Sequence, residues 1–145
     1  MIMVRILLVD DEEYILRYYS YELSCEGHDV ITLNSGDNLL EKNERYQPDM
    51  VIMDIRLFEW DGLDLLKIIK DHYDHLPVII CSAYDTYMDA CLKAGAYLCV
   101  IKSFNLTGLK NAVSELVNGI DSRFGSKPLP EPAERRHGQK NNIHV

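Results

Sequence analysis

Five polar side chains stand at the ends of short apolar runs along the chain. They comprise three carboxylates, one hydroxyl and one ammonium group: Asp10, Asp11, Asp54, Ser82 and Lys102. Taken singly, each fits a plain structural role, such as capping a helix or ending a strand in solvent. Their recurrence at the ends of four separate runs favours one shared site. Because carboxylate oxygens suit Mg²⁺ or Mn²⁺, hard cations that bridge phosphate oxygens, we predict a divalent metal held by Asp10, Asp11 and Asp54.

The elements that must position these residues follow from five apolar runs, at residues 5–9, 30–33, 50–53, 78–81 and 98–101. Most of the runs are continuously apolar, which is typical of strands covered on both faces of a parallel sheet. The segments between the runs have helical spacing. Strands that alternate with helices predict an α/β fold, a doubly wound five-stranded parallel sheet of the (βα)5 type. In such sheets, ligands bind beyond the carboxyl ends of the strands, where the five polar residues fall.

Local signals mark the helix boundaries. Gly27 and Gly95 are expected to end helices, and Ser35 to begin one. Glu12 and Glu13 are expected in the first turn of the first helix, where acids favour the helix dipole, and no metal role is assigned to them. The buried stripes are predicted to be Tyr14, Ile15, Tyr18, Tyr19 and Leu23 in the first helix, Leu63, Leu65, Leu66, Ile68 and Ile69 in the third, and Leu109, Ala112, Val113 and Leu116 in the fifth.

Composition limits the location and the partners. The net charge of −8 at pH 7 argues against direct nucleic-acid binding by this chain, which would need a basic face. The four cysteines form no CxxC pair, which indicates reduced structural thiols. We expect no signal peptide, and no segment approaches the roughly 20 apolar residues of a membrane span. A cytoplasmic protein without membrane contact is therefore expected.

The last twenty or so residues differ from the rest of the chain. Three of the five prolines lie at positions 128, 130 and 132, where they favour an extended spacer. We therefore expect a folded domain over residues 1–122 and a Pro-rich tail or linker over residues 123–145. The tail could link to an output domain, dock a partner or remain disordered.

The motifs, in this order and at this separation, resemble the receiver domain of bacterial two-component response regulators over residues 3–122. They are VDD at 9–11, MD at 53–54 with DG at 61–62, SA at 82–83, and KAGA at 93–96 followed by Lys102. The resemblance implies the flavodoxin-like strand order 2-1-3-4-5. It also implies a phosphorylation-dependent signalling switch that catalyses only its own phosphorylation and dephosphorylation, and so is not an enzyme with an external substrate.

The resemblance implies a role for each site residue. Asp54 would accept a phosphoryl group from a sensor histidine kinase or a histidine phosphotransfer protein. The main-chain carbonyl of Arg56 would join the three carboxylates as a ligand of Mg²⁺. Around the phosphate, Ser82 would donate a hydrogen bond, Lys102 would form an ion pair and Ala83 would leave room. A homodimer could form through the face made by the fourth helix, the fifth strand and the fifth helix.

The sequence departs from the family pattern at several positions. Leu57 and Phe58 replace the usual Met-Pro, and Ser103 replaces the proline that usually follows the lysine. Because a cis bond before serine would cost about 3–4 kcal/mol, we expect a trans bond and a less firmly set loop. Cys99 stands where an aromatic residue is usual on the last strand. Tyr97 shares its strand face and could serve as the moving ring of the switch, or be a fixed surface aromatic.

Two bulky side chains are expected to tune the lifetime of the phosphoryl group. In receivers, the residues two past the phosphoacceptor and two past the hydroxyl flank the path of the hydrolytic water. Here these are Arg56 and Tyr84. Both could screen the aspartyl phosphate, so we predict slow self-dephosphorylation.

Other classes of protein fit the sequence less well. A receiver-like interaction module that acts without phosphorylation is the main alternative. A haloacid-dehalogenase-like phosphatase would need a second Asp at position 56, where Arg56 stands. A flavodoxin would need a Ser/Thr-rich phosphate loop after the first strand, where VDDEE stands.

Overall fold

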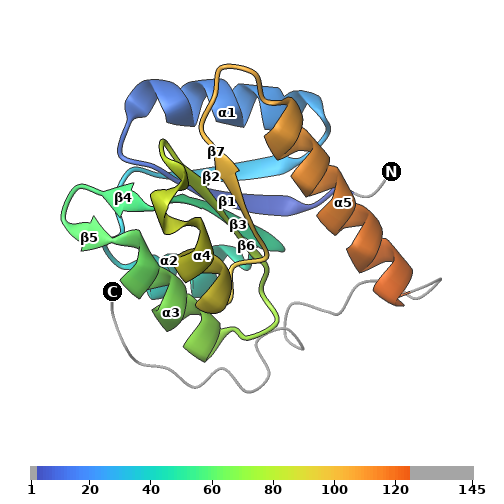
Figure 1. Ribbon diagram of the computed structural model, residues 1–145. Coiled ribbons are helices and arrows are strands. Elements are labelled where there is room, and N and C mark those ends of the chain that lie inside the picture. Colours follow the sequence, from blue (N-terminus) through green and yellow to red (C-terminus); the bar gives the residue numbers. More distant parts are fainter. Residues whose placement is uncertain (1–2, 125–145) are drawn as a thin grey trace.

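A central parallel sheet of five strands organises the computed structural model, which describes residues 3–124 (Figure 1). The elements in chain order are β1 (Arg5–Val9), α1 (Glu13–Cys25), β2 (Asp29–Leu33), α2 (Leu39–Tyr46), β3 (Met50–Asp54), β4 (Arg56–Leu57), β5 (Trp60–Asp61), α3 (Gly62–His72), β6 (Val78–Ser82), η1 (Asp85–Tyr87), α4 (Met88–Lys93), β7 (Leu98–Ile101) and α5 (Thr107–Phe124). The strand order β2-β1-β3-β6-β7 confirms the predicted order 2-1-3-4-5, with the two-residue strands β4 and β5 set apart as a separate hairpin.

Helices cover both faces of this sheet. Helices α1 and α5 pack on one face, and α2, α3 and α4 on the other (Figure 1). Side chains alternate between the two cores, as a strand requires: Ile6 and Leu8 of β1 join the core under α1 and α5, and Leu7 and Val9 join the other. The inner strands β3 and β6 are buried throughout, whereas the edge strands β2 and β7 are half-exposed. The continuous apolar runs therefore reflect burial on both faces.

The boundary between the folded domain and the tail, placed at residue 122, stays a prediction. Residue 122 lies within α5, which runs to Phe124. From residue 125 onward, the expected tail over residues 123–145 lies outside the described residues. None of the helices within residues 3–124 is both long enough and apolar enough to cross a membrane.

The glycine signals for helix ends are confirmed, and the serine signal for a helix start is wrong. Gly27 and Gly95 follow the ends of α1 and α4 with φ angles of 95° and 107°, a region that favours glycine. Ser35 instead closes a local turn, in which its Oγ atom accepts a hydrogen bond from the Asp37 amide at 3.0 Å. Helix α2 begins only at Leu39. Serine side chains serve such turns as readily as helix caps, which explains the error.

The predicted buried stripes are confirmed in α5 and only partly in the other two helices. Leu109, Ala112, Val113 and Leu116 are all buried. In α3, Leu65, Leu66 and Ile69 are buried, while Leu63 and Ile68 lie half-buried at the rim of the core. In α1, Ile15, Tyr19 and Leu23 are buried together with Leu16, Tyr18 is partly buried against the core, and Tyr14 is 55% exposed. The helical turn carries Tyr14 away from the stripe that the other side chains form.

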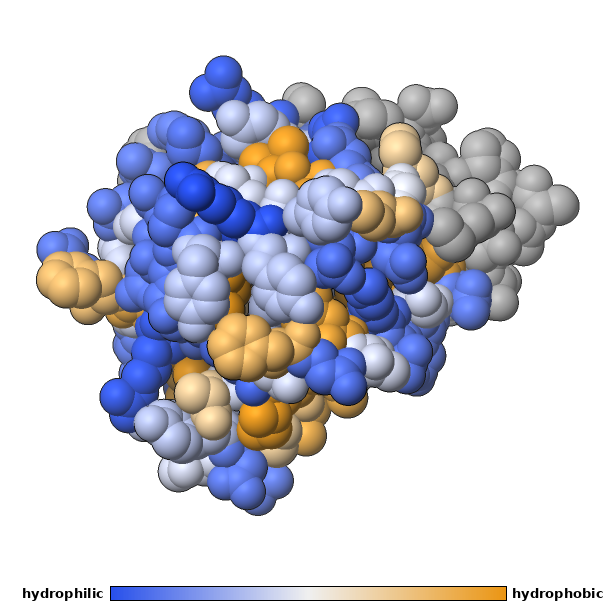
Figure 2. All heavy atoms as spheres, turned by 90° about the horizontal axis from the view of Figure 1, so that it is seen from above, coloured by the Kyte–Doolittle hydropathy of each residue, from blue (hydrophilic) through white to orange (hydrophobic). Residues whose placement is uncertain are grey.

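Aromatic side chains also remain exposed on the surface above α1. Figure 2 looks onto this side and shows apolar and aromatic side chains set among hydrophilic ones. The exposed rings include Tyr14 and Tyr21 of α1. Phe104, in the loop that joins β7 to α5, is also exposed. The hydroxyl of Tyr18 donates a hydrogen bond of 2.6 Å to the Phe104 carbonyl, which joins the loop to the helix.

Candidate functional site

Strand register brings the polar strand ends together. Val9 pairs with Met53, so Asp10, the next residue, lies beside Asp54 at the end of β3. Ser82 pairs with Ile101, which places Lys102 just beyond the last pair of β6 and β7. The Lys102 amide also donates a 2.7 Å hydrogen bond to the Ser82 carbonyl. The predicted site residues thus meet at one edge of the sheet because parallel strands present their carboxyl ends in the same direction.

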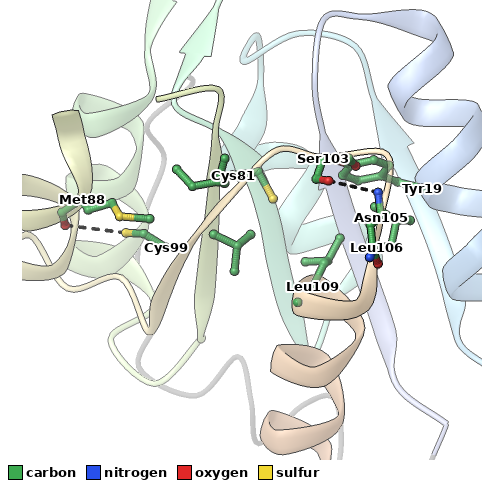
Figure 3. A pocket seen from close by; sticks show the side chains of 11 residues that line it. Tyr19, Cys81, Met88, Cys99, Ser103, Asn105, Leu106 and Leu109 are labelled. Atoms are coloured by element: carbon green, nitrogen blue, oxygen red, sulfur yellow. Dashed lines mark hydrogen bonds between the residues drawn. The ribbon is translucent and has the colours of Figure 1, made fainter. Parts of the chain in front are cut away.

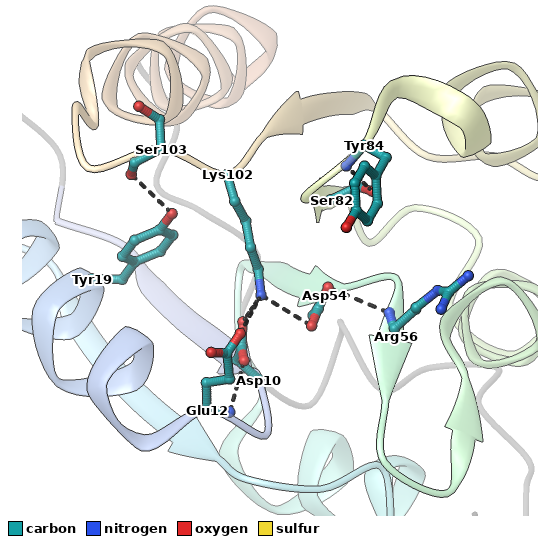
Figure 4. A network of polar contacts seen from close by, with 9 residues as sticks. All are labelled: Asp10, Glu12, Tyr19, Asp54, Arg56, Ser82, Tyr84, Lys102 and Ser103. Atoms are coloured by element: carbon teal, nitrogen blue, oxygen red, sulfur yellow. Dashed lines mark hydrogen bonds and ion pairs between the residues drawn. The ribbon is translucent and has the colours of Figure 1, made fainter.

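The Lys102 ammonium group bridges two of the carboxylates. Its Nζ atom lies 2.8 Å from Oδ2 of Asp10 and 3.1 Å from Oδ2 of Asp54 (Figure 4). All three side chains are largely withdrawn from solvent, with 12% of Lys102, 3% of Asp10 and 9% of Asp54 exposed. Charges this poorly hydrated interact strongly, so the ammonium group offsets the repulsion between the two carboxylates.

The three predicted metal ligands lie within reach of one ion. Asp10, Asp11 and Asp54 each offer a carboxylate oxygen, and these atoms lie within 4.8 Å of one another. Asp10 and Asp54 are buried, whereas Asp11 is exposed. An all-oxygen set with one ligand open to water fits the donor chemistry of Mg²⁺, which keeps several waters and binds through few carboxylates. The residues present therefore fit the implied ion.

Burial and pairing act in opposite directions on the site's ionisation. Burial raises the pKa of Asp10 and of Asp54 above the ordinary carboxyl value, although Lys102 partly opposes this in both cases. Burial also lowers the pKa of Lys102, but the hydrogen bonds and negative charges of Asp10 and Asp54 outweigh it and leave that pKa raised. Lys102 therefore stays an ammonium ion at neutral pH, as a counter-charge for phosphate requires.

Glu12 belongs to the site's surroundings, which the sequence did not indicate. Its carboxylate lies 3.5 Å from the Lys102 ammonium group and is 49% exposed. Glu12 is also the residue just before α1, where its main-chain carbonyl accepts hydrogen bonds from Ile15 and Leu16. Its amide donates a 2.9 Å hydrogen bond to Asp10 and thereby orients the Asp10 carboxylate. No sequence signal distinguishes Glu12 from the neighbouring acids.

The phosphate-binding candidates on β6 lie at the rim of the same edge. Ser82 is buried, and its hydroxyl oxygen accepts a 3.1 Å hydrogen bond from the Tyr84 amide. This turn leaves Ala83 and Tyr84 exposed, with 65% of Tyr84 accessible. In Figure 4 the Tyr84 ring lies beside Ser82, in the short loop that leads from β6 into η1.

Arg56 contacts the site through its backbone and a neighbouring helix through its side chain. Its amide donates a 3.3 Å hydrogen bond to Oδ1 of Asp54. Its guanidinium group donates a 2.8 Å hydrogen bond to the Tyr87 hydroxyl and lies 5.6 Å from the centre of that ring. In Figure 4 the Arg56 side chain points away from Asp54.

A hairpin that was not predicted holds the Arg56 backbone in place. Strands β4 and β5 pair antiparallel, with Leu57 buried and Phe58 89% exposed at the tip. The DG motif ends the hairpin: Asp61 caps α3 by accepting a 2.8 Å hydrogen bond from Leu63, and the Gly62 amide donates one of 2.8 Å to the Ile55 carbonyl. A Cβ atom on Gly62 would lie 2.4 Å from that carbonyl oxygen, so only glycine fits.

The loop after Lys102 is anchored, despite the missing proline. No peptide bond among the described residues is cis, so the Lys102–Ser103 bond is trans, as expected. The hydroxyl of Tyr19 donates a 3.3 Å hydrogen bond to the Ser103 carbonyl, beside the Tyr18 bond to Phe104. Two tyrosines of α1 thus hold the loop that we expected to be less firmly set.

A pocket of about 250 Å³ lies beside β7, next to the position of the missing aromatic residue (Figure 3). Its lining includes Cys81, Cys99, Met88, Leu106 and Leu109. Burial raises the pKa of both Cys81 and Cys99 to about 12, so both thiols stay protonated. Cys81 is a buried core residue, as predicted, whereas Cys99 is half-buried. Tyr97 does not line the pocket: it precedes β7, is 41% exposed, and its hydroxyl lies 3.4 Å from Glu115.

The comparisons with known proteins identify the family. The family model of the response regulator receiver domain matches residues 6–114 of the sequence. The chain therefore belongs to this family. It is 39% identical to the regulatory protein AtoC of Escherichia coli (strain K12) over 108 residues, which cover 72% of this chain and 23% of AtoC. It is 35% identical over 88 residues to the alkaline phosphatase synthesis transcriptional regulatory protein PhoP of Bacillus subtilis (strain 168), covering 61% of this chain and 37% of PhoP. The chain thus spans less than half of these two relatives.

Solved structures agree with this family. The response regulator protein TrrA of Thermotoga maritima, in complex with Mg²⁺–BeF, has a TM-score of 0.74 and 34% identity; the match covers 79% of this chain and 99% of TrrA. A CheY-like receiver domain protein from Methanospirillum hungatei JF-1 has a TM-score of 0.77 and 25% identity, covering 84% and 99%. The chain is therefore a receiver domain, the signalling module of two-component response regulators.

Proposed function

We propose that Asp54 accepts the phosphoryl group in this receiver domain, with Mg²⁺ held by Asp10, Asp11, Asp54 and the main-chain carbonyl of Arg56. The observation that carries the proposal is the Lys102 ammonium group, which lies 3.1 Å from Asp54 while Asp10 holds it at 2.8 Å. A buried carboxylate beside a fixed cation is suited to carry added negative charge. Mn²⁺ has the same preference for oxygen ligands and could replace Mg²⁺.

Phosphoryl transfer depends mainly on correct positioning of the reacting groups and on neutralisation of the phosphoryl charge. An oxygen of Asp54 attacks the phosphorus of a phosphohistidine, the O–P bond forms, and the P–N bond breaks to leave the imidazole. Lys102 moves with the charge from the carboxylate to the phosphoryl oxygens, and Ser82 can turn its hydroxyl toward them. The exposed position of Ala83 leaves the approach free of bulk. Asp10, Asp11 and Asp54 would hold Mg²⁺, which when bound would neutralise part of the phosphoryl charge.

The partner in this proposal is a sensor histidine kinase or a histidine phosphotransfer protein, met in the cytoplasm. The chain catalyses only its own phosphorylation and dephosphorylation and has no external substrate. Among the described residues, the exposed carboxylate of Asp11 and the exposed loop at Ala83 border the approach to Asp54. A phosphohistidine ring would therefore approach Asp54, whose side chain is 9% exposed, from this exposed side of the sheet edge.

Labelling with a small phosphodonor tests the assignment of Asp54. Incubation with acetyl phosphate and Mg²⁺ should add the mass of one phosphoryl group to the wild type, and chelation of the metal should prevent the addition. The Asp54→Asn variant should gain nothing. Asp71→Asn, which removes an exposed carboxylate on α3, is the matched control and should be labelled like the wild type. Labelling that persists in Asp54→Asn would refute the assignment, and an unlabelled wild type would favour the interaction module.

A second copy of the chain could pair across α4, β7 and α5. Leu92 on α4, Tyr97 just before β7 and Ile101 at the end of β7 are exposed by 47%, 41% and 45%, and apolar side chains of this size favour contact with another protein surface. Sedimentation should detect dimers when beryllofluoride, a phosphoryl mimic, is added. An Ile101→Asp substitution should return the protein to monomers.

A further inference from the structure

We propose that Arg56 transmits the state of Asp54 to η1 and α4, because its guanidinium group exchanges the Tyr87 hydroxyl for the phosphoryl oxygens. This inference rests on the proposed phosphorylation of Asp54. It gives Arg56 a role as a positioning residue that responds to the phosphoryl group, in addition to the role of its main-chain carbonyl.

Arg56 physically joins Asp54 to Tyr87. Its amide donates to Oδ1 of Asp54 at 3.3 Å, and its guanidinium group donates to the Tyr87 hydroxyl at 2.8 Å. The guanidinium carbon also lies 5.6 Å from the centre of the Tyr87 ring, which adds a cation–π contact. One residue therefore touches both the acceptor carboxylate and the last residue of η1.

Phosphorylation would change the balance between these two partners. A phosphoryl group carries a charge of about −1.5 to −2 and offers oxygens that a planar guanidinium group binds in pairs. The Tyr87 hydroxyl is a neutral acceptor and makes a weaker bond. Lys102 and Mg²⁺ would each neutralise part of the phosphoryl charge, but Lys102 is shared with Asp10, so the phosphoryl group retains negative charge that attracts a further cation. The Arg56 guanidinium group points toward Tyr87 in this structure, and because Arg56 follows Asp54 by two residues it can turn back to the phosphoryl oxygens.

The loss of the Tyr87 contact would release a lightly held segment. Tyr87 ends η1, and α4 begins at the next residue and is six residues long. Cys91 is the buried side chain of α4, and Tyr87 itself packs only partly against the core. A helix this short has little stability of its own, so its position depends on contacts such as the one with Arg56.

Signal transmission from Asp54 through Arg56 and Tyr87 to α4 does not require an aromatic ring on β7. Cys99 occupies the usual ring position, and its thiol lies 3.7 Å from the Met88 carbonyl. Tyr97 precedes the strand, at the end opposite Lys102. Arg56 reaches the start of α4 directly from the loop after β3, so it can act where the ring is missing.

NMR spectra with Mg²⁺ and saturating beryllofluoride test the exchange. In the wild type, the mimic should shift the amide signals near Asp54, the side-chain Nε signal of Arg56, and the amide signals of residues 85–93. Arg56→Gln keeps the main-chain carbonyl that is proposed to bind Mg²⁺ and removes only the guanidinium group, so at saturating beryllofluoride the signals near Asp54 should still shift, and those of residues 85–93 should not. Arg45→Gln is the matched control, because Arg45 also lies 5.5 Å above a tyrosine ring, that of Tyr46, and does not border the site.

A Tyr87→Phe variant tests the competing partner separately. Without the hydroxyl acceptor, residues 85–93 of the free protein should give signals already displaced toward the beryllofluoride positions. Affinity for beryllofluoride should rise about two- to fivefold, the effect of freeing one exposed hydrogen bond.

Other patterns of beryllofluoride-induced shifts would contradict either the role of Arg56 or the phosphorylation of Asp54. Unchanged shifts of residues 85–93 in Arg56→Gln overturn the inference and leave Asp54 phosphorylation intact. Shifts that survive in Arg56→Gln but disappear in Tyr97→Ala assign the switch to Tyr97 instead. Absence of any shift near Asp54 in the wild type overturns the proposed function, and this inference with it.

Discussion

The ammonium nitrogen of Lys102 lies 2.8 Å from Oδ2 of Asp10, closer than the 3.1 Å that separates it from Asp54. Asp10 is in turn oriented by the amide of Glu12, at 2.9 Å. The lysine is therefore held by a residue that keeps its charge when Asp54 is modified. Lys102 can follow the added phosphoryl charge without leaving its first partner.

Removal of Lys102 should destabilise the metal-free protein. A Lys102→Ala substitution leaves Asp10 and Asp54 buried side by side without a counter-charge, which we expect to cost about 3 kcal/mol of unfolding free energy. Lys110→Ala is the control: its ion pair with Glu22 is 2.7 Å long but about a quarter exposed, and it should cost no more than about 1 kcal/mol. Urea denaturation measures both. Equal losses in the two variants would mean that Lys102 does not offset repulsion at the site.

Mg²⁺ should stabilise the fold through Asp11. Because the ion binds the folded site, the unfolding free energy should rise with concentration as RT ln(1 + [L]/Kd). An Asp11→Ala substitution should weaken this dependence while leaving, or raising, the stability of the metal-free protein, since Asp11 is exposed and like-charged with its neighbours. Thermal unfolding over a series of Mg²⁺ concentrations measures the effect. An unchanged Mg²⁺ affinity in Asp11→Ala would argue against a shared site.

Stability should fall in mild acid because of His28. Burial lowers the pKa of His28, and its Nδ1 atom accepts a 3.3 Å hydrogen bond from the Val4 amide, so the folded state holds the neutral ring. The unfolded chain binds the proton first, near pH 6.5. Stability is therefore complete above that pH and falls as pH drops toward the lowered folded pKa, by at most about 1.4 kcal/mol per pH unit.

The His28→Asn variant isolates this contribution. The asparagine oxygen can accept the Val4 hydrogen bond and does not titrate near neutral pH. Urea denaturation of both proteins from about pH 7.5 to about pH 5.5 should show a steeper loss in the wild type. Parallel pH profiles would exclude His28 as the cause.

Two glycine substitutions should have opposite signs. Gly62→Ala places a Cβ atom 2.4 Å from the Ile55 carbonyl oxygen, and the forced backbone shift should cost about 1–3 kcal/mol. Gly119→Ala meets nothing within 4 Å in α5 and should add up to about 1 kcal/mol through helix propensity. Denaturation midpoints measure the difference. A tolerated Gly62→Ala would show that the β5–α3 junction can yield.

The lifetime of the aspartyl phosphate should depend on Tyr84. The side chain follows Ser82 by two residues and stands exposed beside the site, where it can hinder the attacking water. Tyr84→Ala should therefore speed phosphate loss from labelled protein, followed by intact mass over time. Tyr14→Ala, which removes another exposed ring, on α1 and away from Ser82, should leave the rate unchanged. A slower or unchanged rate in Tyr84→Ala would count against screening.

The sheet and the site centre could be predicted because both depend on local patterns. Continuous apolar runs identify inner strands, and the residue after each run then falls at a known edge of the sheet. Asp10, Asp54 and Lys102 meet there as the strand ends require. The ends of α1 and α4 could also be predicted from the glycines that follow them, because few other residues adopt the backbone angles found there.

The missed features depend on contacts that spacing does not encode. Arg56 and Tyr87 are 31 positions apart and meet only because the fold brings η1 beside the start of the β4–β5 hairpin. That hairpin consists of two-residue strands, too short to give a periodic signal. The pairing of Glu12 with Lys102 likewise depends on which of several neighbouring acids turns toward the lysine.

The burial of the thiols has a practical consequence for labelling. Cys81 and Cys91 are buried, and burial raises the pKa of Cys99 to about 12, whereas Cys25 at the end of α1 is exposed. A maleimide dye at neutral pH should therefore modify Cys25 in preference to the other three cysteines, without prior mutagenesis. Cys25 lies at the far end of α1 from Asp10 and Asp11, so a fluorophore attached there could report binding of a partner while leaving the phosphorylation chemistry undisturbed.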